Sequence, residues 1–323
     1  MSSDTRDDPQ FPLLLRLHAI TFGAEGIHLC ELRAPHGGEL PAFTAGAHID
    51  LSLPNGMMRQ YSLSNPQAER HRYVIGVKRD PASRGGSRFM HEDLRVGTLM
   101  RTSLPRNNFP LAEGAAHSVL IAGGIGITPI RCMVDRLQRL GRSWELHYGV
   151  RRRAEAVFLD ELRAGPSQLH LHVDDEAAGA LMDVGGIVKA ASEEAHLYCC
   201  GPTPMLKAFE AATAARPESH VHAEYFSPDA PAAVEGGFSV RMARSGRTIP
   251  VQPGQTILAA LKAAGVEAPF SCAQGVCGAC ETRVLDGVPD HRDMILSPQE
   301  KATNQTMMIC CSGSKTPMLV LDI

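Results

Sequence analysis

Four cysteines near the C-terminal end of the chain have a spacing that suits metal chemistry. Cys272 and Cys277 are separated by four residues, Cys277 and Cys280 by two, and Cys310 follows after twenty-nine more. Plant-type 2Fe-2S clusters are held in this way, by three thiolates on one tight loop and a fourth from a distant segment. Gly275 lets such a loop fold closely around the metal. The spacing therefore predicts a 2Fe-2S cluster.

Two alternatives to this ligand set remain open. A structural zinc ion also accepts four thiolates, although zinc ribbons prefer two C-x2-C pairs. Cys311 adjoins Cys310 and is an alternative fourth ligand, but the spacing favours Cys310 and we interpret Cys311 as a small buried side chain. Cys199 and Cys200 end a predicted strand, where we expect packing and site lining rather than catalytic disulfide chemistry.

A glycine-rich turn at residues 121–129 joins a predicted strand to a predicted helix. It places backbone N–H groups beside a helix N-terminus, an arrangement that receives phosphate. Because Pro129 stands where G-x-G-x-x-G has its third glycine, the turn alone is a weak signal. Residues 200–202, Cys-Gly-Pro, end a later predicted strand, and open α/β sheets bind ligands at the carboxyl ends of such strands.

Two earlier segments carry side chains that suit a ring and a phosphate. Residues 59–62, Arg-Gln-Tyr-Ser, lie on a predicted strand, and residues 84–87, Arg-Gly-Gly-Ser, stand just before a predicted helix. An aromatic ring, hydroxyls and arginines could hold a flavin and its phosphate. Taken alone, the segments are more simply a strand and a surface turn.

No convincing catalytic triad is present, and one histidine pair is ambiguous. His170 and His172 share a face of a predicted strand, with Asp174 and Asp175 after them. A metal is conceivable there, but no fourth converging ligand is evident. We interpret the segment as a solvated strand end near a dinucleotide.

The elements that position these residues change character along the chain. The first ~110 residues alternate between apolar and polar positions, as at residues 48–53, with an Asn55-Gly56 hairpin signal. Strands at 73–77 and 98–104 and a helix at 87–94 complete the pattern of a small closed antiparallel barrel. From Ser118, short strands alternate with helices, which predicts a parallel sheet. The expected strands lie at 118–122, 144–150, 169–173, 196–200 and 220–226.

Local signals set the first helix and the domain limits. Thr128 is expected to cap that helix, with Pro129 at its first position and Gly141 at its end. Residues 227–237 show no periodicity and contain two prolines and two glycines, as a linker does. After them we expect a last region with a hairpin turn at 245–246, a helix at 257–265 and a strand at 318–321. We predict domains at 1–112, 113–227 and 238–323, with a linker at 228–237.

Composition excludes several classes of protein. The chain has 323 residues, 44% hydrophobic and 21% charged, with a formal net charge of -3. This is typical of a soluble multi-domain protein and offers no positive field for nucleic acid. No apolar stretch reaches the ~18 residues of a membrane span, and the acidic start does not resemble a signal peptide. We expect a cytoplasmic protein without membrane or nucleic-acid partners.

In combined order, Arg59-x-Tyr61-Ser62, the turn at 123–129, residues 200–202 and the cysteine loop resemble the phthalate dioxygenase reductase family, which includes the vanillate demethylase reductases. The resemblance spans about residues 12–323. It implies an antiparallel β-barrel that binds FMN, an α/β parallel-sheet domain that binds NAD and an α+β β-grasp ferredoxin domain with a 2Fe-2S cluster.

The resemblance also implies site residues, and none of them is catalytic because the cofactors transfer the electrons. For FMN they are Arg59, Gln60, Tyr61, Ser62, Gly76, Val77, Lys78, Arg84, Gly85, Gly86, Ser87, Thr128 and Phe226. For NAD they are Gly123, Gly124, Gly126, Thr128, Pro129, Arg151, Cys200, Gly201 and Pro202. The implied cluster ligands are Cys272, Cys277, Cys280 and Cys310. Gln60 departs from the threonine of one relative, so its backbone is expected to matter more than its side chain.

The implied function is electron transfer from NADH through FMN and the 2Fe-2S cluster to a terminal Rieske-type oxygenase acting on a small, often aromatic, compound. A flavin is required because NADH releases electrons in pairs and the cluster accepts them singly. Alternative readings are an electron donor to a haem-thiolate monooxygenase, a free flavin reductase and a redox sensor. NADPH and FAD are the alternative cofactors, NADPH because residues 151–153, Arg-Arg-Arg, could grip a 2′-phosphate.

Overall fold

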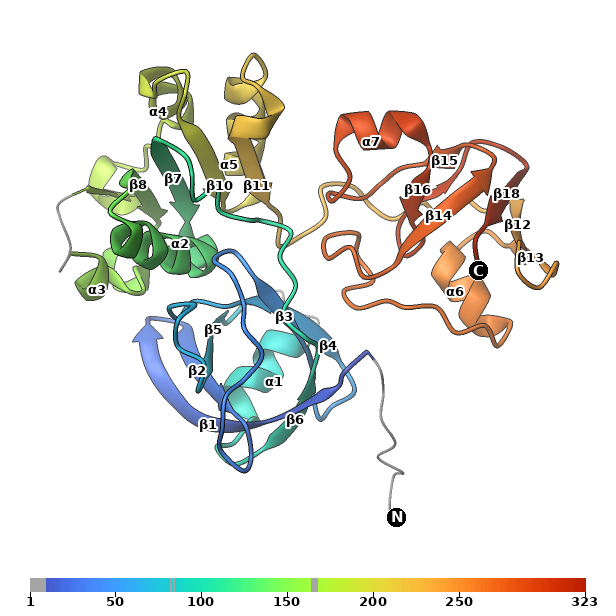
Figure 1. Ribbon diagram of the computed structural model, residues 1–323, viewed down its shortest axis with the longest axis horizontal. Helices are drawn as coiled ribbons and strands as arrows, with labels where there is room; N and C mark the ends of the chain where they lie inside the picture. Colours follow the sequence, from blue (N-terminus) through green and yellow to red (C-terminus); the bar gives the residue numbers. More distant parts are fainter. Residues whose placement is uncertain (1–9, 82, 84, 164–167) are drawn as a thin grey trace. The chain divides into compact units, whose positions relative to one another are not determined.

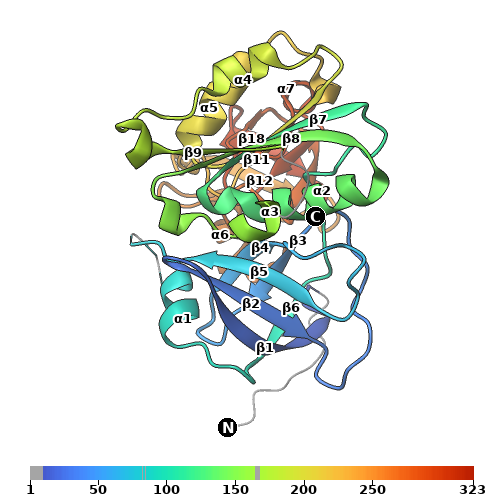
Figure 2. The same ribbon diagram turned by 90° about the vertical axis from the view of Figure 1, so that its left-hand side faces the viewer.

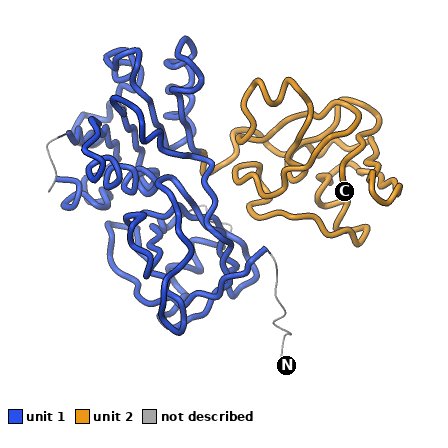
Figure 3. The backbone as a smooth tube through the Cα atoms, viewed as in Figure 1, with its two compact units in different colours: residues 1–224 blue, residues 225–323 orange. Residues whose placement is uncertain are grey.

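The computed structural model describes residues 10–81, 83, 85–163 and 168–323. The chain divides into two compact units, residues 1–224 and 225–323, coloured separately in Figure 3. Each unit has its own cluster of buried apolar side chains. Among the described residues, no helix combines the length and the apolar character that crossing a bilayer requires.

The first unit begins with a six-stranded antiparallel sheet in the order β4-β3-β6-β1-β2-β5. The sheet curls so that its two edge strands, β4 and β5, approach each other. Just after β4, Leu63 pairs with Ile75 of β5, and the Ser64 amide donates to the Val74 carbonyl at 2.9 Å. This curled sheet is the expected barrel, and Figure 2 shows α1 beside it. Its elements are β1 (Leu13–Ala24), β2 (Ile27–Arg33), β3 (His48–Ser52), β4 (Met58–Ser62), β5 (Tyr73–Lys78), α1 (Gly86–Glu92) and β6 (Leu99–Thr102).

The rest of the first unit is a parallel five-stranded sheet in the order β11-β10-β7-β8-β9. Figure 2 shows α2 and α3 on the side of this sheet next to the barrel, and α4 and α5 on the opposite side. Its strands are β7 (His117–Gly123), β8 (Ser143–Val150), β9 (Leu169–Val173), β10 (His196–Cys200) and β11 (Val221–Glu224). Its α-helices are α2 (Ile127–Leu140), α3 (Leu159–Arg163), α4 (Val184–Ala190) and α5 (Thr203–Thr213).

The start of α2 differs from the sequence prediction. The turn at Gly124–Gly126 is itself a 3-10 helix and runs directly into α2, so Gly126 is the N-cap and has αR backbone angles. The expected cap, Thr128, lies inside the helix, where its hydroxyl donates to the Ile125 carbonyl at 2.9 Å. A threonine cap needs an extended residue before the helix, and this turn has none. Gly141 ends the helix as predicted, with a left-handed φ of 63°.

The second unit is an α+β domain built on a mixed five-stranded sheet in the order β13-β12-β18-β14-β16. Strands β12 and β18 pair in parallel, and the other neighbours pair antiparallel. Helix α6 buries Ile257 and Leu261 in the same core as Val240 and Leu319. Figure 1 shows its elements in orange and red: β12 (Phe238–Met242), β13 (Thr248–Val251), α6 (Ile257–Ala263), β14 (Glu281–Asp286), β15 (Pro289–Asp290), α7 (Pro298–Thr303), β16 (Thr306–Met308), β17 (Gly313–Ser314) and β18 (Met318–Leu321).

Candidate functional site

The loop between α6 and β14 carries Cys272, Cys277 and Cys280, and Cys310, which follows β16, lies beside them. Cys277, Cys280 and Cys310 are buried and Cys272 is half-buried. Hydrogen bonds with Cys277 and then Cys310 lower the pKa of the Cys272 thiol. A hydrogen bond with Cys310 likewise lowers the pKa of Cys280. The same mutual hydrogen bonds raise the pKa of Cys277 and Cys310, so the four sulfurs lie within hydrogen-bond reach of one another. Four converging sulfur donors fit a cluster or another thiophilic metal.

Cys311 packs against the cysteine loop at Gly275. Its sulfur donates to the Met308 carbonyl at 3.7 Å, and a Cβ on Gly275 would stand 2.4 Å from it. Gly275 also has a left-handed φ of 76°, so two constraints require glycine there. Cys310 reaches the sulfurs of both Cys272 and Cys280, and we therefore keep Cys310 as the proposed fourth ligand.

Arg59 and Gly86 form the part of the barrel that was predicted to hold a phosphate. A Cβ on Gly86 would lie 2.1 Å from Nε of Arg59, so the guanidinium lies directly over this glycine. Arg59 donates to the Met58 carbonyl at 2.7 Å, which fixes the side chain. An arginine held beside the start of α1 is a suitable partner for a phosphate. Arg84, predicted for the same site, lies outside the described residues.

The predicted flavin residues on β5 meet the glycine-rich turn. A Cβ on Gly76 would stand 2.7 Å from Cγ2 of Thr128, so β5 packs directly on the start of α2. Lys78, at the end of β5, lies 3.6 Å from the Glu155 carboxylate. The barrel and the parallel sheet thus share one junction, at which residues predicted for FMN and for NAD are in contact.

A half-buried acid at this junction was not predicted from the sequence. Ser62 on β4 donates to Oε2 of Glu224 at 3.3 Å, and the Cys200 sulfur lies 3.9 Å from the same oxygen. Burial raises the pKa of Glu224 to about 8, and burial also raises the pKa of Cys200. The junction therefore holds a carboxyl that is mostly protonated at neutral pH. Glu224 has no motif of its own, and only the fold brings it to Ser62.

The two predicted dinucleotide motifs touch through their backbones. A Cβ on Gly126 would stand 2.2 Å from the Cys200 carbonyl oxygen, and one on Gly123 would stand 2.6 Å from Cδ of Pro202. Gly201 in turn approaches Gly123, since its Cβ would lie 3.2 Å from the Gly123 Cα. Glycines at these positions let β7 and β10 present both turns at one edge of the sheet, as their parallel pairing requires.

The arginine run after β8 has unequal partners. Arg152 pairs with Glu25 and Glu155, and Arg153 pairs with Glu176 at 2.6 Å. Arg151 is exposed, and within the described ranges its side chain has no ion pair or hydrogen bond. Of the three, Arg151 is therefore the one available to a ligand. Phe226 follows β11 in the second unit and is 39% exposed, and its stacking on the flavin stays a prediction.

The remaining predicted residues lie on the same elements. Gln60 and Tyr61 are partly buried on β4, and burial raises the pKa of the Tyr61 phenol, which keeps it a neutral hydrogen-bond donor. Gly85 precedes α1 with a left-handed φ of 107°, and the Ser87 hydroxyl accepts from the Asp80 amide at 3.2 Å. Val77 is buried on β5, and Pro129 is buried in α2. The residues present thus fit a flavin at the barrel and a dinucleotide at the turn.

Comparison with known protein families gives two matches. Residues 120–211 match the family described as "Oxidoreductase NAD-binding domain". Residues 240–314 match the family described as "2Fe-2S iron-sulfur cluster binding domain". The first match covers the glycine-rich turn and residues 200–202, and the second covers the four cysteines that were predicted as ligands.

Whole-length relatives are also found. Phenoxybenzoate dioxygenase subunit beta of Ectopseudomonas oleovorans is 58% identical, over 97% of this chain and 98% of that protein. The crystal structure of phthalate dioxygenase reductase has a TM-score of 0.73 and 39% identity, over 96% of this chain and 98% of that one. An intact type IV self-sufficient cytochrome P450 monooxygenase has a TM-score of 0.86 and 39% identity, over 96% of this chain but only 41% of that one.

Proposed function

This chain belongs to the phthalate dioxygenase reductase family, and on that premise we propose that it delivers electrons to a terminal Rieske-type oxygenase. The chain itself is an NADH-dependent flavin iron-sulfur oxidoreductase with an FMN barrel, an NAD-binding sheet and a 2Fe-2S domain. The proposed oxygenase acts on a small, aromatic compound, because the named relatives serve oxygenases of phenoxybenzoate and phthalate.

The observation that best supports the proposal is the contact between β5 and the start of α2, where Gly76 meets Thr128. A hydride moves only over a short distance, so flavin and nicotinamide must lie against each other. Residues of the barrel and of the glycine-rich turn that touch directly are suited to hold them so. When bound at these residues, FMN would supply the conversion of the two-electron hydride of NADH into single electrons, the form that a 2Fe-2S cluster at the four cysteines would accept.

The chain's own residues bind, orient and hold a proton. Arg59 would pair with the FMN phosphate, and Ser62 and Tyr61 would supply hydroxyls to the ring side of the site. Oε2 of Glu224 accepts a hydrogen bond from the Ser62 hydroxyl, and the raised pKa of this carboxyl would keep a proton on it near neutral pH, so the junction would contain an exchangeable proton. Residues 123–126 and 200–202 offer the backbone edge on which NADH lies.

A single substitution tests the order of the carriers. In Cys272→Ser the cluster lacks one thiolate, while the flavin and NADH sites in the first unit are unchanged. We expect NADH to reduce the flavin at the wild-type rate in stopped flow, and electron delivery to the oxygenase to fall to background. Cys311→Ser is the matched control and should retain delivery. Full delivery by Cys272→Ser would favour a free flavin reductase instead.

One observation favours a second acceptor. The structural match to the self-sufficient cytochrome P450 monooxygenase covers 96% of this chain and 41% of that chain. A module of this kind can therefore be joined to a haem protein. A separate haem-thiolate monooxygenase is therefore the alternative partner. Purified protein mixed with each acceptor and NADH distinguishes the two, because the true partner supports substrate-coupled turnover rather than uncoupled NADH oxidation.

We place the protein in the cytoplasm, where NADH is supplied and thiols stay reduced. All nine cysteines are free in the structure, as a reducing compartment requires. Cell fractionation followed by an immunoblot tests this location, and recovery in a membrane or periplasmic fraction would contradict it.

A further inference from the structure

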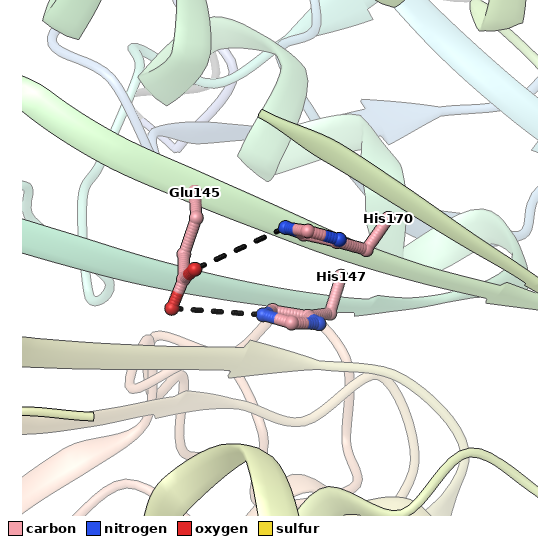
Figure 4. A group of neighbouring side chains, drawn as sticks. All are labelled: Glu145, His147 and His170. Carbon is pink, nitrogen blue, oxygen red and sulfur yellow. Dashed lines mark ion pairs between the residues drawn. The ribbon is translucent and has the colours of Figure 1, made fainter. Parts of the chain in front are cut away.

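A cluster of imidazoles surrounds one carboxylate on the parallel sheet of the first unit. Glu145 and His147 lie two residues apart on β8 and so share one face of the sheet. The strand register pairs His147 with His170 on β9, which brings the second ring to that face. Figure 4 shows the two rings lying side by side, each with a nitrogen turned toward Glu145.

This cluster is separate from the junction that holds the cofactor residues. Glu145 pairs with Val119 and His147 with Ile121, both before the end of β7 at Gly123, after which the turn Gly124–Gly126 begins. The side chains that alternate with the cluster on β8, Trp144 and Leu146, are buried in the core on the opposite face of the sheet.

The three side chains face one another without hydrogen bonds. Nε2 of His147 lies 3.6 Å from Oε1 of Glu145, and Nε2 of His170 lies 4.0 Å from Oε2. One donor atom from each residue lies within 4.8 Å of the others, and the two rings are 4.7 Å apart at 15°. Nε2 of His147 is buried and has no hydrogen-bond partner in the described part of the chain. A buried nitrogen left without a partner needs an explanation.

A nearby histidine is oriented toward the same carboxylate. Nδ1 of His117 is hydrogen-bonded to the Ser143 hydroxyl at 2.8 Å, and its Nε2 lies 4.0 Å from Oε1 of Glu145. Metal-binding imidazoles commonly use one nitrogen for such an orienting hydrogen bond and the other for the metal. His170 is 58% exposed, so the cluster is open to water on one side.

We propose that Glu145, His147 and His170 bind a divalent transition-metal ion of the zinc class, with His117 or a water as fourth ligand. Two imidazoles, a carboxylate and one open position form a donor set that zinc accepts. Tetrahedral bonds of about 2.0–2.1 Å place donor atoms about 3.3 Å apart, so small side-chain rotations complete the site. The ion would join β8 to β9, which is the edge strand of the sheet.

The environment of His147 is consistent with this site. The His147 ring stacks on the His170 ring and turns Nε2 toward Oε1 of Glu145, so this nitrogen faces the other two proposed ligands. The neighbour His172 does not compete, because its Nε2 is hydrogen-bonded to the Ala180 carbonyl at 2.7 Å. From the sequence we interpreted His170 and His172 together as a solvated strand end. In the fold His170 faces Glu145, whereas His172 is hydrogen-bonded to the Ala180 carbonyl.

Zinc binding to the full-length protein, with flavin and cluster loaded, tests the site. Equilibrium dialysis against zinc chloride, followed by mass spectrometry of zinc and iron, should find one zinc per chain beyond the iron of the cluster. His170→Ala and Glu145→Gln should each weaken binding by about tenfold or more. His71→Ala, which removes an exposed barrel histidine, is the control and should bind zinc as the wild type does.

A second readout uses stability. Zinc should raise the unfolding temperature of the first unit in the wild type and in His71→Ala, but not in His170→Ala, since an ion that binds only the folded state stabilises it. The proposal is overturned if the wild type binds no zinc, or if His170→Ala and Glu145→Gln bind it as tightly as the wild type. The second result would place the ion elsewhere, for example on thiolates.

Discussion

At the scale of single residues, Glu224 is the side chain whose chemistry the fold changes most at the junction. Its pKa is about 8 in the fold against an ordinary value of 4.5, because burial disfavours the charged form. The folded state therefore binds a proton that the unfolded state has released between these two values. This contribution to stability is complete below about pH 4.5 and is lost as the pH rises toward about 8.

The Glu224→Gln variant should remove that pH dependence. We expect wild type and variant to differ little in unfolding temperature below about pH 5, and the variant to become relatively more stable as the pH rises toward about 8, above which the difference stays constant. Each kcal/mol of difference corresponds to about 2–4 °C for a unit of this size. Thermal unfolding of both holoproteins across this range measures the effect, and parallel curves would contradict the burial argument.

Arg151 supports a second prediction at this scale, about the choice of coenzyme. Its guanidinium has no partner among the described residues, while Arg152 and Arg153 are held in ion pairs. A 2′-phosphate at the end of β8 would pair with it. Arg151→Gln should lower kcat/KM for NADPH about tenfold and leave NADH within about twofold, which corresponds to one charge-assisted hydrogen bond. Arg153→Gln is the control and should leave kcat/KM unchanged for both coenzymes. If Arg151→Gln lowered kcat/KM equally for NADPH and NADH, this role of Arg151 would be excluded.

At the scale of elements, close approach of two turns sets the geometry of the NAD edge. Gly126→Ala would place a Cβ 2.2 Å from the Cys200 carbonyl oxygen, where backbone rather than a flexible side chain must move. We expect a loss of about 1–3 kcal/mol in unfolding free energy and a higher KM for NADH. Gly114→Ala adds a Cβ with nothing within 4 Å and should be neutral. Urea titration and steady-state kinetics measure both, and a neutral Gly126→Ala would refute the contact.

Elements with strong local signals were predictable, and contacts between distant elements were not. The strands expected at 169–173, 196–200 and 318–321 have the observed bounds of β9, β10 and β18, because short apolar runs between turns define them. The cap at Thr128 was wrong because the preceding glycines form a helical turn of their own. Ser62 and Glu224 are 162 residues apart, so only tertiary structure could reveal their hydrogen bond.

At the scale of the whole molecule, the two units have separate hydrophobic cores, so we expect each unit to have its own stability against unfolding. The first core joins the barrel and the parallel sheet, and the second is built around α6 and the mixed sheet. The three domains expected from the sequence stay a prediction; by their contacts, the barrel and the parallel sheet fall in one compact unit, residues 1–224. The shared junction of Gly76 and Thr128 is the physical reason why the barrel and the NAD-binding sheet behave as one unit.

Separate cores predict separate unfolding transitions in the holoprotein. Cluster loss on heating is followed by visible absorbance, and flavin release is followed by fluorescence. Cys310→Ser removes a buried proposed ligand from the second core, so the cluster transition should move to lower temperature while the flavin transition stays within about 1 °C, as expected for units that do not share a core. Gly126→Ala, in the first unit, should have the opposite pattern. A single transition that moves with either substitution would show that the units fold as one cooperative body.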